Sequence, residues 1–255
     1  MRIGIISLGC PKNLVDSEVM IGLLLQDGHE IVDPDEADVV VVNTCAFIKA
    51  AEEEAEEVIS EILDDKGERK LIVAGCLAQR YGKSLFDRFP GVDALVGTGE
   101  FQKIAHVIRS LRGSESKAVF VGRPEYLYDH LTPRCLGTPP YYAYIKIAEG
   151  CSNACSFCTI PKLRGRYRSR EPDSILAEAT ALAEAGVKEL VLISQDTTRY
   201  GLDLYGLSKL SDLLSELAEI DGPRWIRFLY SYPSRVDEKL VEVIAENERI
   251  CKYLD

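Results

Sequence analysis

The sequence lacks several features that would assign it to a class at once. No apolar run approaches the ~18 residues of a membrane span. The N-terminal stretch MRIGIISLGCPKN turns polar too soon for a signal peptide. Basic residues number only 30 against 41 acidic ones, so the net charge of −11 argues against a protein that coats nucleic acid. We therefore expect a cytoplasmic globular protein whose 255 residues form one large domain or two medium ones.

Two nucleotide-binding motifs are also missing. In the segment 75–84, six residues separate the two glycines where a P-loop requires four. In the segment 97–102, a glutamine stands where the dinucleotide-binding fingerprint requires its third glycine. The chain has three histidines, which are scattered and indicate no site: His29, His106 and His130.

Residues 1–112 alternate short apolar runs with amphipathic stretches. We expect strands at residues 3–7, 39–42, 71–74 and 94–96, and helices at 14–26, 48–63, 77–89 and 102–111. The β-branched run at 39–42 is typical of a strand covered on both faces. This order predicts an N-terminal α/β domain with a doubly wound parallel sheet.

Residues 113–139 are polar and rich in proline, which indicates a linker. From residue 140 the alternation resumes. We expect strands at 142–147, 189–193, 225–230 and 250–254, and helices at 173–185, 207–220 and 234–247, the last with Ser234 as N-cap and Asp237 three residues on. Three βα units and a lone strand are too few to close a barrel and leave an edge exposed. We therefore expect residues 140–255 to be the first half of a truncated (β/α) barrel from a longer protein.

Eight cysteines are many for a chain without an export signal, which favours metal or redox chemistry over disulfides. Cys151, Cys155 and Cys158 follow a predicted strand directly. Structural zinc usually takes four ligands, whereas three thiolates suit a 4Fe–4S cluster with one open iron. A zinc site completed by Cys135, or simply packed thiols, is the alternative.

Three further cysteines lack a spacing motif, but each follows a predicted strand: Cys10, Cys45 and Cys76. The carboxyl ends of parallel strands lie at one edge of a sheet, where ligands bind. The pattern therefore predicts a second three-thiolate cluster, and the alternative is that each thiol is a small buried hydrophobe. We expect no such role for Cys135 or Cys251.

With both cysteine sets in view, the chain resembles the radical-SAM methylthiotransferases over essentially its whole length. The CxxxCxxC loop with Phe157 before its last cysteine is the radical-SAM motif, and the upstream trio is typical of this family. The segments LGCPKNLVDSE, SQDTTRYG and FLYSYP resemble the members that modify an aspartate rather than a tRNA adenosine. Family members carry a longer radical-SAM barrel and a TRAM domain, both of which would lie beyond Asp255.

The resemblance implies two 4Fe–4S clusters. The Cys151/Cys155/Cys158 cluster would bind S-adenosylmethionine (SAM) and cleave it to a 5′-deoxyadenosyl radical, which removes hydrogen from an unactivated carbon. The second cluster would hold the sulfur, and a separate SAM would supply the methyl group. The substrate would be the β-carbon of an aspartate in small-subunit ribosomal protein S-twelve. A low-potential electron donor and a sulfur source would be partners.

The resemblance also points to SAM contacts. Phe157 would pack near the adenine, and Gln195 and Asp196 follow the second barrel strand, where the family contacts SAM. Arg164, with the basic residues at 166, 168 and 170, would meet the SAM carboxylate or an acidic substrate. Asn43 and Thr44 would shape the pocket of the Cys10/Cys45/Cys76 cluster. Ordinary turns and solvated loops are the alternatives.

Two rival functions stay open. A tRNA methylthiotransferase acting on isopentenyladenosine next to the anticodon would need a basic surface with stacking aromatics, which the net charge disfavours. A non-enzymatic iron–sulfur carrier would not explain the βα series behind the cysteine loop.

Overall fold

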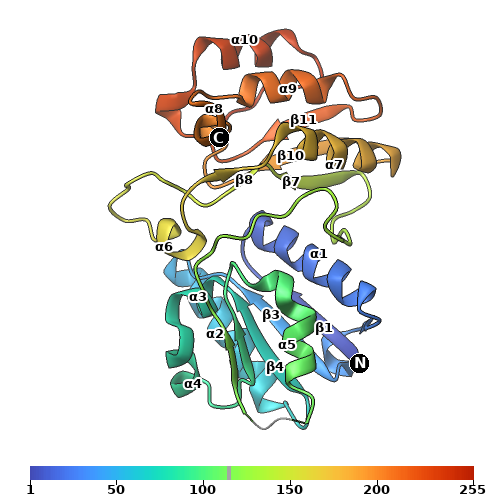
Figure 1. Cartoon of the computed structure of the whole chain (residues 1–255), viewed down its shortest axis with the longest axis vertical. Coiled ribbons are helices and arrows are strands. Elements are labelled where there is room, and N and C mark those ends of the chain that lie inside the picture. The colour runs from blue at the N-terminus through green and yellow to red at the C-terminus, as the bar shows by residue number, and fades with distance from the viewer. Residues whose placement is uncertain (114–115) are drawn as a thin grey trace. The chain divides into compact units, whose positions relative to one another are not determined.

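The computed structural model describes residues 1–113 and 116–255, and the chain forms two compact units (Figure 1). The N-terminal unit comprises Met1–Tyr126, Pro133–Cys135 and Ala154–Gly165. The C-terminal unit comprises Leu127–Thr132, Leu136–Asn153 and Arg166–Asp255. Residues 114–115, part of the predicted linker, lie outside the described residues.

The N-terminal unit is built on one six-stranded sheet with the order β2-β1-β3-β4-β5-β6. All neighbouring strands are parallel, which confirms the predicted α/β fold. The strands are β1 (Arg2–Ser7), β2 (Glu30–Ile31), β3 (Val39–Thr44), β4 (Lys70–Gly75), β5 (Ala94–Val96) and β6 (Ala118–Phe120). Every residue of β3 is buried, as expected for a central strand covered on both faces.

Helices cover this sheet on both faces. They are α1 (Pro11–Gln26), α2 (Lys49–Asp64), α3 (Cys76–Tyr81), α4 (Leu85–Arg88) and α5 (Ile104–Ser110), with 3-10 turns at Pro34–Glu36, Gly82–Ser84 and Phe101–Lys103. Val40 and Val42 of β3 share a core cluster with Ala55 and Ile59 of α2. Because side chains alternate along a strand, the odd-numbered residues of β3 face the opposite layer, where α1 packs on β1, β2 and β3.

Two expectations for the N-terminal half are wrong. The helix predicted at 77–89 is broken into α3, a 3-10 turn and α4, because Gly82 ends α3 with a φ of 52°. The segment predicted to be a linker contains β6, which pairs with β5 in register Leu95↔Val119. A strand of three residues in polar and proline-rich surroundings gives no periodic signal.

Two segments distant in sequence complete the N-terminal unit. In Pro133–Cys135, the Arg134 guanidinium pairs with the buried Glu18 carboxylate of α1 at 2.6 Å. Ala154–Gly165 contains the short helix α6 (Ile160–Arg164), whose Leu163 joins the core cluster that includes Cys76. The Leu163 carbonyl accepts a hydrogen bond from the hydroxyl of Thr98. Neither segment belongs to the continuous stretch that we expected to form the domain.

The C-terminal unit has a parallel three-stranded sheet, order β11-β10-β7, and a two-stranded antiparallel sheet of β8 and β9. The strands are β7 (Tyr142–Lys146), β8 (Ala148–Glu149), β9 (Arg168–Ser169), β10 (Glu189–Ile193) and β11 (Trp225–Phe228). The helices are α7 (Pro172–Glu184), α8 (Leu202–Tyr205), α9 (Leu210–Ala218) and α10 (Glu238–Glu246), with 3-10 turns at Thr197–Arg199 and Pro233–Arg235. Residues of α7, α9 and α10 bury the sheet in one core cluster. This is the predicted series of βα units.

Two local expectations for this unit are wrong. The predicted strand at 250–254 is reduced to one parallel bridge between Ile226 and Ile250. Asp237, not Ser234, caps the last helix, because its side chain accepts the N–H of Leu240 at 2.9 Å while Ser234 lies in a 3-10 turn.

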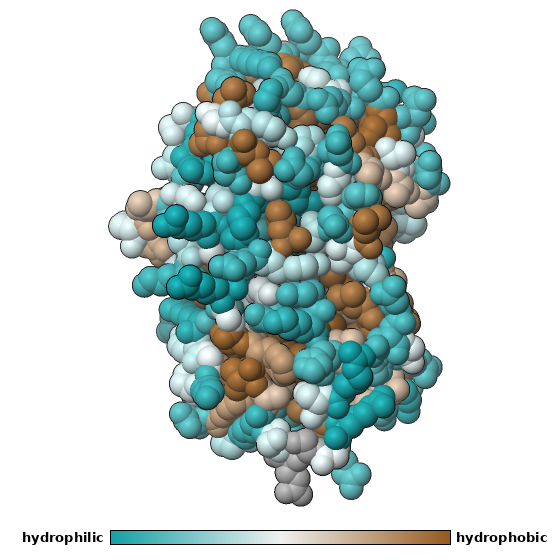
Figure 2. All heavy atoms as spheres, viewed as in Figure 1, coloured by the Kyte–Doolittle hydropathy of each residue, from teal (hydrophilic) through white to brown (hydrophobic). Residues whose placement is uncertain are grey.

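Hydrophilic side chains predominate on the face shown in Figure 2, and apolar residues gather there only in small separate groups. None of the helices in residues 1–113 and 116–255 is both long and apolar enough to cross a membrane.

Candidate functional site

The first three cysteines lie at the carboxyl ends of three adjacent strands. Cys10 is the N-cap of α1, three residues after β1 ends. Cys45 directly follows β3, and Cys76 directly follows β4 as the first residue of α3. Because β1, β3 and β4 are neighbours and parallel, the three residues share one edge of the sheet, as their positions in the sequence predicted. We call them the N-terminal trio.

Glycine before Cys10 and before Cys76 lets the backbone close up at this edge. Gly9 has a φ of +86°, and a Cβ on it would lie 2.4 Å from the Cβ and 3.1 Å from the Sγ of Cys45. Gly75 has a φ of +88°, and a Cβ on it would lie 2.4 Å from the Asn43 side chain. Any larger residue at either position would both strain the backbone and clash.

The three thiols are free, and two are buried: Cys45 is 7% exposed and Cys76 is 4% exposed. Burial raises the pKa of Cys76 to about 11, with a further rise from the neighbouring Cys45 and Cys10 and an opposing effect from Arg164. Burial likewise raises the pKa of Cys45. A thiol must lose its proton to bind a metal, and a raised pKa opposes that loss. The site therefore favours a metal centre whose strong positive charge stabilises the thiolates.

A buried amide and a buried hydroxyl tie the three strand ends together. The Asn13 side chain donates to the carbonyls of Leu8 at 3.1 Å and Thr44 at 2.8 Å. The Thr44 hydroxyl donates to the Ala74 carbonyl at 2.6 Å and accepts the N–H of Leu77 at 3.2 Å. Thr44 therefore links β3 to β4 and to the first turn of α3, close to Cys76.

Asn43, the second residue expected at this pocket, also holds its walls. Its side-chain amide donates to the Asn13 carbonyl at 2.8 Å and to the Ser17 hydroxyl at 2.9 Å. Ser17 in turn donates to Ser7 at 2.9 Å, at the end of β1. Buried polar groups that are satisfied in this way fix a single arrangement of the loops.

Arg164 has different partners from those we expected. It is 2% exposed, its Nη1 pairs with the Asp16 carboxylate at 2.6 Å, and its Nη2 donates to Asn13 Oδ1. Its charge also acts on the thiols of Cys45 and Cys76. The structure thus places Arg164 beside the N-terminal trio. Asp16 is among the buried positions of α1, where a charge needs a partner.

The second cysteine set lies on one short loop. Cys151 follows β8 through Gly150, which has a φ of +82°, and its sulfur accepts the N–H of Asn153 at 3.4 Å. Cys151 belongs to the C-terminal unit, whereas Cys155 and Cys158 belong to the N-terminal unit and are half-buried. The N–H of Cys158 donates to the Cys155 carbonyl at 3.1 Å, which makes a turn between them.

Three side chains hydrogen-bond to one another and hold Asn153, the second residue after Cys151, in place. The Asp196 Oδ2 atom accepts from the Asn153 amide and from Arg235 Nη1, both at 2.8 Å. Arg235 Nη2 donates to Asn153 Oδ1 at 2.8 Å. The other oxygen of Asp196 accepts the Thr198 hydroxyl at 2.6 Å. Asp196, which we expected to contact SAM, therefore positions the cysteine loop, and Asn153 and Arg235 were not predicted.

Gln195 offers a hydrogen-bond acceptor. Its Nε2 donates to Glu149, whose other carboxylate oxygen pairs with Lys146 at 2.6 Å. The N–H of Gly150 also donates to Glu149, at 3.2 Å. Among the described residues, nothing donates to the buried Oε1 of Gln195. The end of β10 therefore carries an acceptor that suits a ligand with an N–H or ammonium donor.

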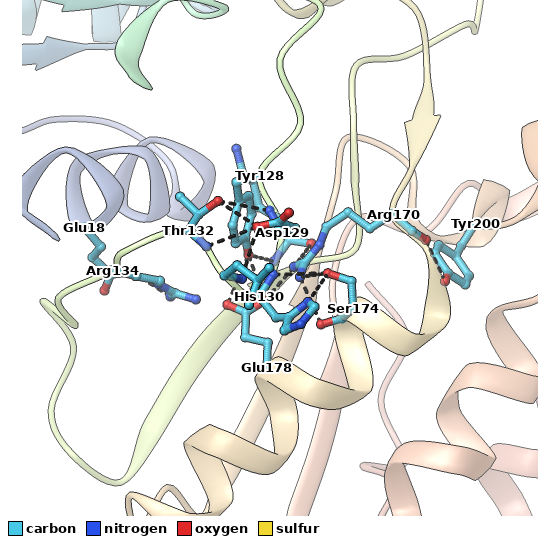
Figure 3. A network of polar contacts seen from close by, with 12 residues as sticks. Glu18, Tyr128, Asp129, His130, Thr132, Arg134, Arg170, Ser174, Glu178 and Tyr200 are labelled. Atoms are coloured by element: carbon cyan, nitrogen blue, oxygen red, sulfur yellow. Dashed lines mark hydrogen bonds and ion pairs between the residues drawn. The ribbon is translucent and has the colours of Figure 1, made fainter. Parts of the chain in front are cut away.

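Two further residues that we expected near SAM, Phe157 and Arg170, lie in very different surroundings. The Phe157 side chain is 81% exposed, so it is available for packing against a planar ligand. Arg170 is a structural residue instead. Its guanidinium pairs with Glu178 at 2.5 Å, donates to Ser174 Oγ at 2.9 Å and lies 4.3 Å from the ring centre of Tyr128 (Figure 3).

In residues 1–113 and 116–255, no three His, Cys, Asp or Glu side chains converge closely enough to share a single metal ion. A 4Fe–4S cluster does not require such convergence, because each thiolate binds a different iron. The donor set of the N-terminal trio, which is made only of sulfur at one sheet edge, fits such a cluster better than it fits zinc.

Comparisons with known proteins identify relatives of both halves of the chain. The model described as "Uncharacterized protein family UPF0004" matches residues 2–97, and the Radical SAM superfamily model matches residues 145–254. Ribosomal protein uS12 methylthiotransferase RimO from Thermoanaerobacter sp. is 52% identical over 257 residues, and RimO from Pelotomaculum thermopropionicum is 51% identical over 260. Both alignments cover 100% of this chain. The chain belongs to the radical-SAM methylthiotransferase family.

The chain spans only 59% and 58% of the length of those two relatives. Among solved structures, the radical SAM methyltransferase TsrM from Kitasatospora setae matches 99% of this chain and 58% of its own, with a TM-score of 0.66 at 19% identity. The cobalamin-dependent radical enzyme OxsB matches 96% of this chain and 41% of its own, with a TM-score of 0.52 at 13% identity. At such low identities these two structures show the shared fold alone.

Proposed function

We propose that the whole protein uses SAM to add a methylthio group to the β-carbon of an aspartate in ribosomal protein uS12, the small-subunit protein S-twelve. The observation that carries the proposal is the pair of separate cysteine trios. One trio lies at the carboxyl edge of β1, β3 and β4, and the other on the loop after β8. The relatives named RimO at about half identity supply the substrate class.

Each trio would hold one 4Fe–4S cluster. The ligands would be Cys151, Cys155 and Cys158 for one cluster and Cys10, Cys45 and Cys76 for the other. With both clusters bound, the chemistry supplied is reductive cleavage of SAM at one site and storage of the transferable sulfur at the other. A low-potential electron donor, a sulfur source and uS12 would be the partners, and the cytoplasm would be the compartment.

The other residues bind and orient. Gln195 would accept a hydrogen bond from the ammonium of SAM through its buried, unpartnered Oε1. Phe157 would pack against the adenine with its exposed ring. Asp196 and Arg235 would hold Asn153, and with it the start of the cysteine loop, in one position. We move Asp196 and Arg164 from SAM contact to support of the two cysteine sets, because their side chains are buried in ion pairs.

Incubation of the reconstituted full-length protein with SAM, dithionite and uS12 tests this proposal. We expect 5′-deoxyadenosine and a uS12 that gains the mass of one methylthio group on aspartate. Mass spectrometry of uS12 and of tRNA from a deletion strain separates the rivals. Loss of a methylthio-adenosine with unchanged uS12 would show a tRNA enzyme, and no 5′-deoxyadenosine at all would show an iron–sulfur carrier.

A further inference from the structure

We propose that Arg164 is a positioning residue of the N-terminal trio, whose buried and fixed guanidinium charge stabilises the reduced form of a cluster bound there. This inference rests on the proposed function, because it assumes that the trio holds a cluster. It adds a role for a residue in the other cysteine segment, six positions after Cys158.

The first step of the argument is the burial of Arg164. A guanidinium that is 2% exposed must be paired, and the Asp16 carboxylate, itself 3% exposed, lies 2.6 Å away. Asn13 accepts a second hydrogen bond from the same group. These two residues of α1 hold the planar group in one orientation, since an arginine fork that binds two fixed acceptors cannot rotate freely.

The second step is what that orientation presents to the thiols. α6, which ends at Arg164, packs against α3, which begins at Cys76. Asn13, which accepts from Arg164, also donates to the carbonyl of Thr44, the residue before Cys45, at 2.8 Å. The thiols of Cys45 and Cys76 are buried, so water does little to stabilise their negative charge. A cluster with three thiolates becomes still more negative when it is reduced. A fixed positive charge nearby therefore favours the reduced form.

The third step is how the backbone delivers the residue. Arg164 is the last residue of α6, and the preceding residue, Leu163, packs in the core cluster that contains Cys76 and Leu77. The hydroxyl of Thr98 donates to the Leu163 carbonyl. α6 is thus anchored within the N-terminal unit at the level of Cys76, which fixes where the Arg164 side chain starts.

The test isolates the cluster of the N-terminal trio. The full chain with Cys151, Cys155 and Cys158 all replaced by alanine is reconstituted anaerobically with ferrous iron and sulfide, and its midpoint potential is measured by EPR-monitored titration. On this background we expect Arg164→Gln to disfavour the reduced cluster about tenfold, which equals about 59 mV for a one-electron couple. Arg164→Lys keeps the charge and should retain most of the parent potential.

Two companion variants make the result specific. Asp16→Asn removes the anion that offsets Arg164, so it should move the potential in the opposite direction to Arg164→Gln. Arg69→Gln is the matched control, because it removes an equal charge from the residue before β4, at the end of that strand opposite Cys76. The control should leave the potential unchanged.

The outcomes separate the two proposals. Absence of iron in the parent background refutes the cluster at the N-terminal trio, and with it both this inference and that part of the proposed function. A full iron content with the same midpoint potential in Arg164→Gln and the parent overturns the role of Arg164 alone. If Arg164→Gln does not assemble a cluster, an unchanged potential in Asp16→Asn overturns it equally.

Discussion

The side-chain amide of Asn153 lies 2.8 Å from the carboxylate of Asp196, which joins the loop after Cys151 to the end of β10. Arg235 closes the contact from the 3-10 turn after β11. Asn153 and Asp196 are 43 residues apart in the sequence, and Asp196 and Arg235 are 39 apart. The segments that follow two strands thus hold one loop in place.

Asp196→Asn should weaken the contacts that hold the cysteine loop at the end of β10. The substitution removes the charge that pairs with Arg235 and leaves that guanidinium without its anion. Changes to groups that orient metal ligands typically cost about 10–100-fold in metal affinity or activity. We expect a loss in that range in SAM cleavage, together with an altered EPR signal of the Cys151 cluster on SAM addition. Asp212→Asn, which disrupts only ion pairs with Lys209 and Lys239, should match the parent.

The iron content should divide evenly between the two cysteine sets. Replacing Cys10, Cys45 and Cys76 by alanine should leave about half of the iron and sulfide, and so should replacing Cys151, Cys155 and Cys158. Anaerobic reconstitution followed by iron and sulfide assays measures both. Parent-level iron in the first variant would refute a cluster at the N-terminal trio.

Gly9→Ala should prevent a cluster from forming at the N-terminal trio. The added Cβ meets the Cβ of Cys45 at 2.4 Å, in a backbone conformation with φ +86°. Gly28→Ala is a matched control, because its φ of +80° carries similar strain but nothing lies within 4 Å of the new Cβ. The left-handed conformation costs each variant about 1–2 kcal/mol in unfolding free energy. Only Gly9→Ala should also lose iron, and equal iron in the two variants would contradict the close approach.

Asp93 should make the stability of the N-terminal unit depend on acid pH. Burial alone would raise its pKa, but hydrogen bonds from Lys66, the Leu71 N–H and Lys70 outweigh burial and hold the pKa below the usual 3.8. A lowered pKa stabilises the fold at pH values above about 3.8 and loses this effect as the pH falls through the native pKa. Asp93→Asn should therefore lower the unfolding free energy at pH 7 by about 1.5–3 kcal/mol, and by progressively less below pH ~4.

Urea unfolding monitored in two ways checks the Asp93 prediction. Far-UV circular dichroism includes the N-terminal unit, whereas the fluorescence of the single tryptophan, Trp225, reports on the C-terminal unit. We expect the substitution to shift the unfolding transition that circular dichroism follows and not the transition that Trp225 fluorescence follows. A difference from the parent that persists undiminished at pH 3 would contradict the assigned role of the carboxylate.

The sequence predicted the parts of the fold that repeat. Short apolar runs located β3 and β4, and their parallel order placed Cys45 and Cys76 at one sheet edge with Cys10. Short elements such as β6 and α6 gave no periodic signal, since three to five residues do not complete a pattern. The helix break at Gly82 was missed because it depends on the positive φ of that one residue.

Contacts between distant residues were the part that the sequence could not supply. Arg164 was assigned to SAM because it follows the radical-SAM motif, yet its partner Asp16 lies 148 residues away in sequence. Asp196 was expected at the ligand for a similar reason. Spacing along the chain identifies which side chains can share a loop or a helix face. It does not identify which buried charges form pairs when they lie far apart in the sequence.

The two returning segments of the N-terminal unit, 133–135 and 154–165, limit how the protein can be dissected. A polypeptide cut after residue 112 would keep Asp16 and Glu18 but lose Arg164 and Arg134, the cations that neutralise them. Two interior carboxylates would then have to take up protons or turn outward to solvent, and each loss of a buried partner costs about 3–5 kcal/mol. Expression trials and crystallisation fragments should therefore extend at least through residue 165.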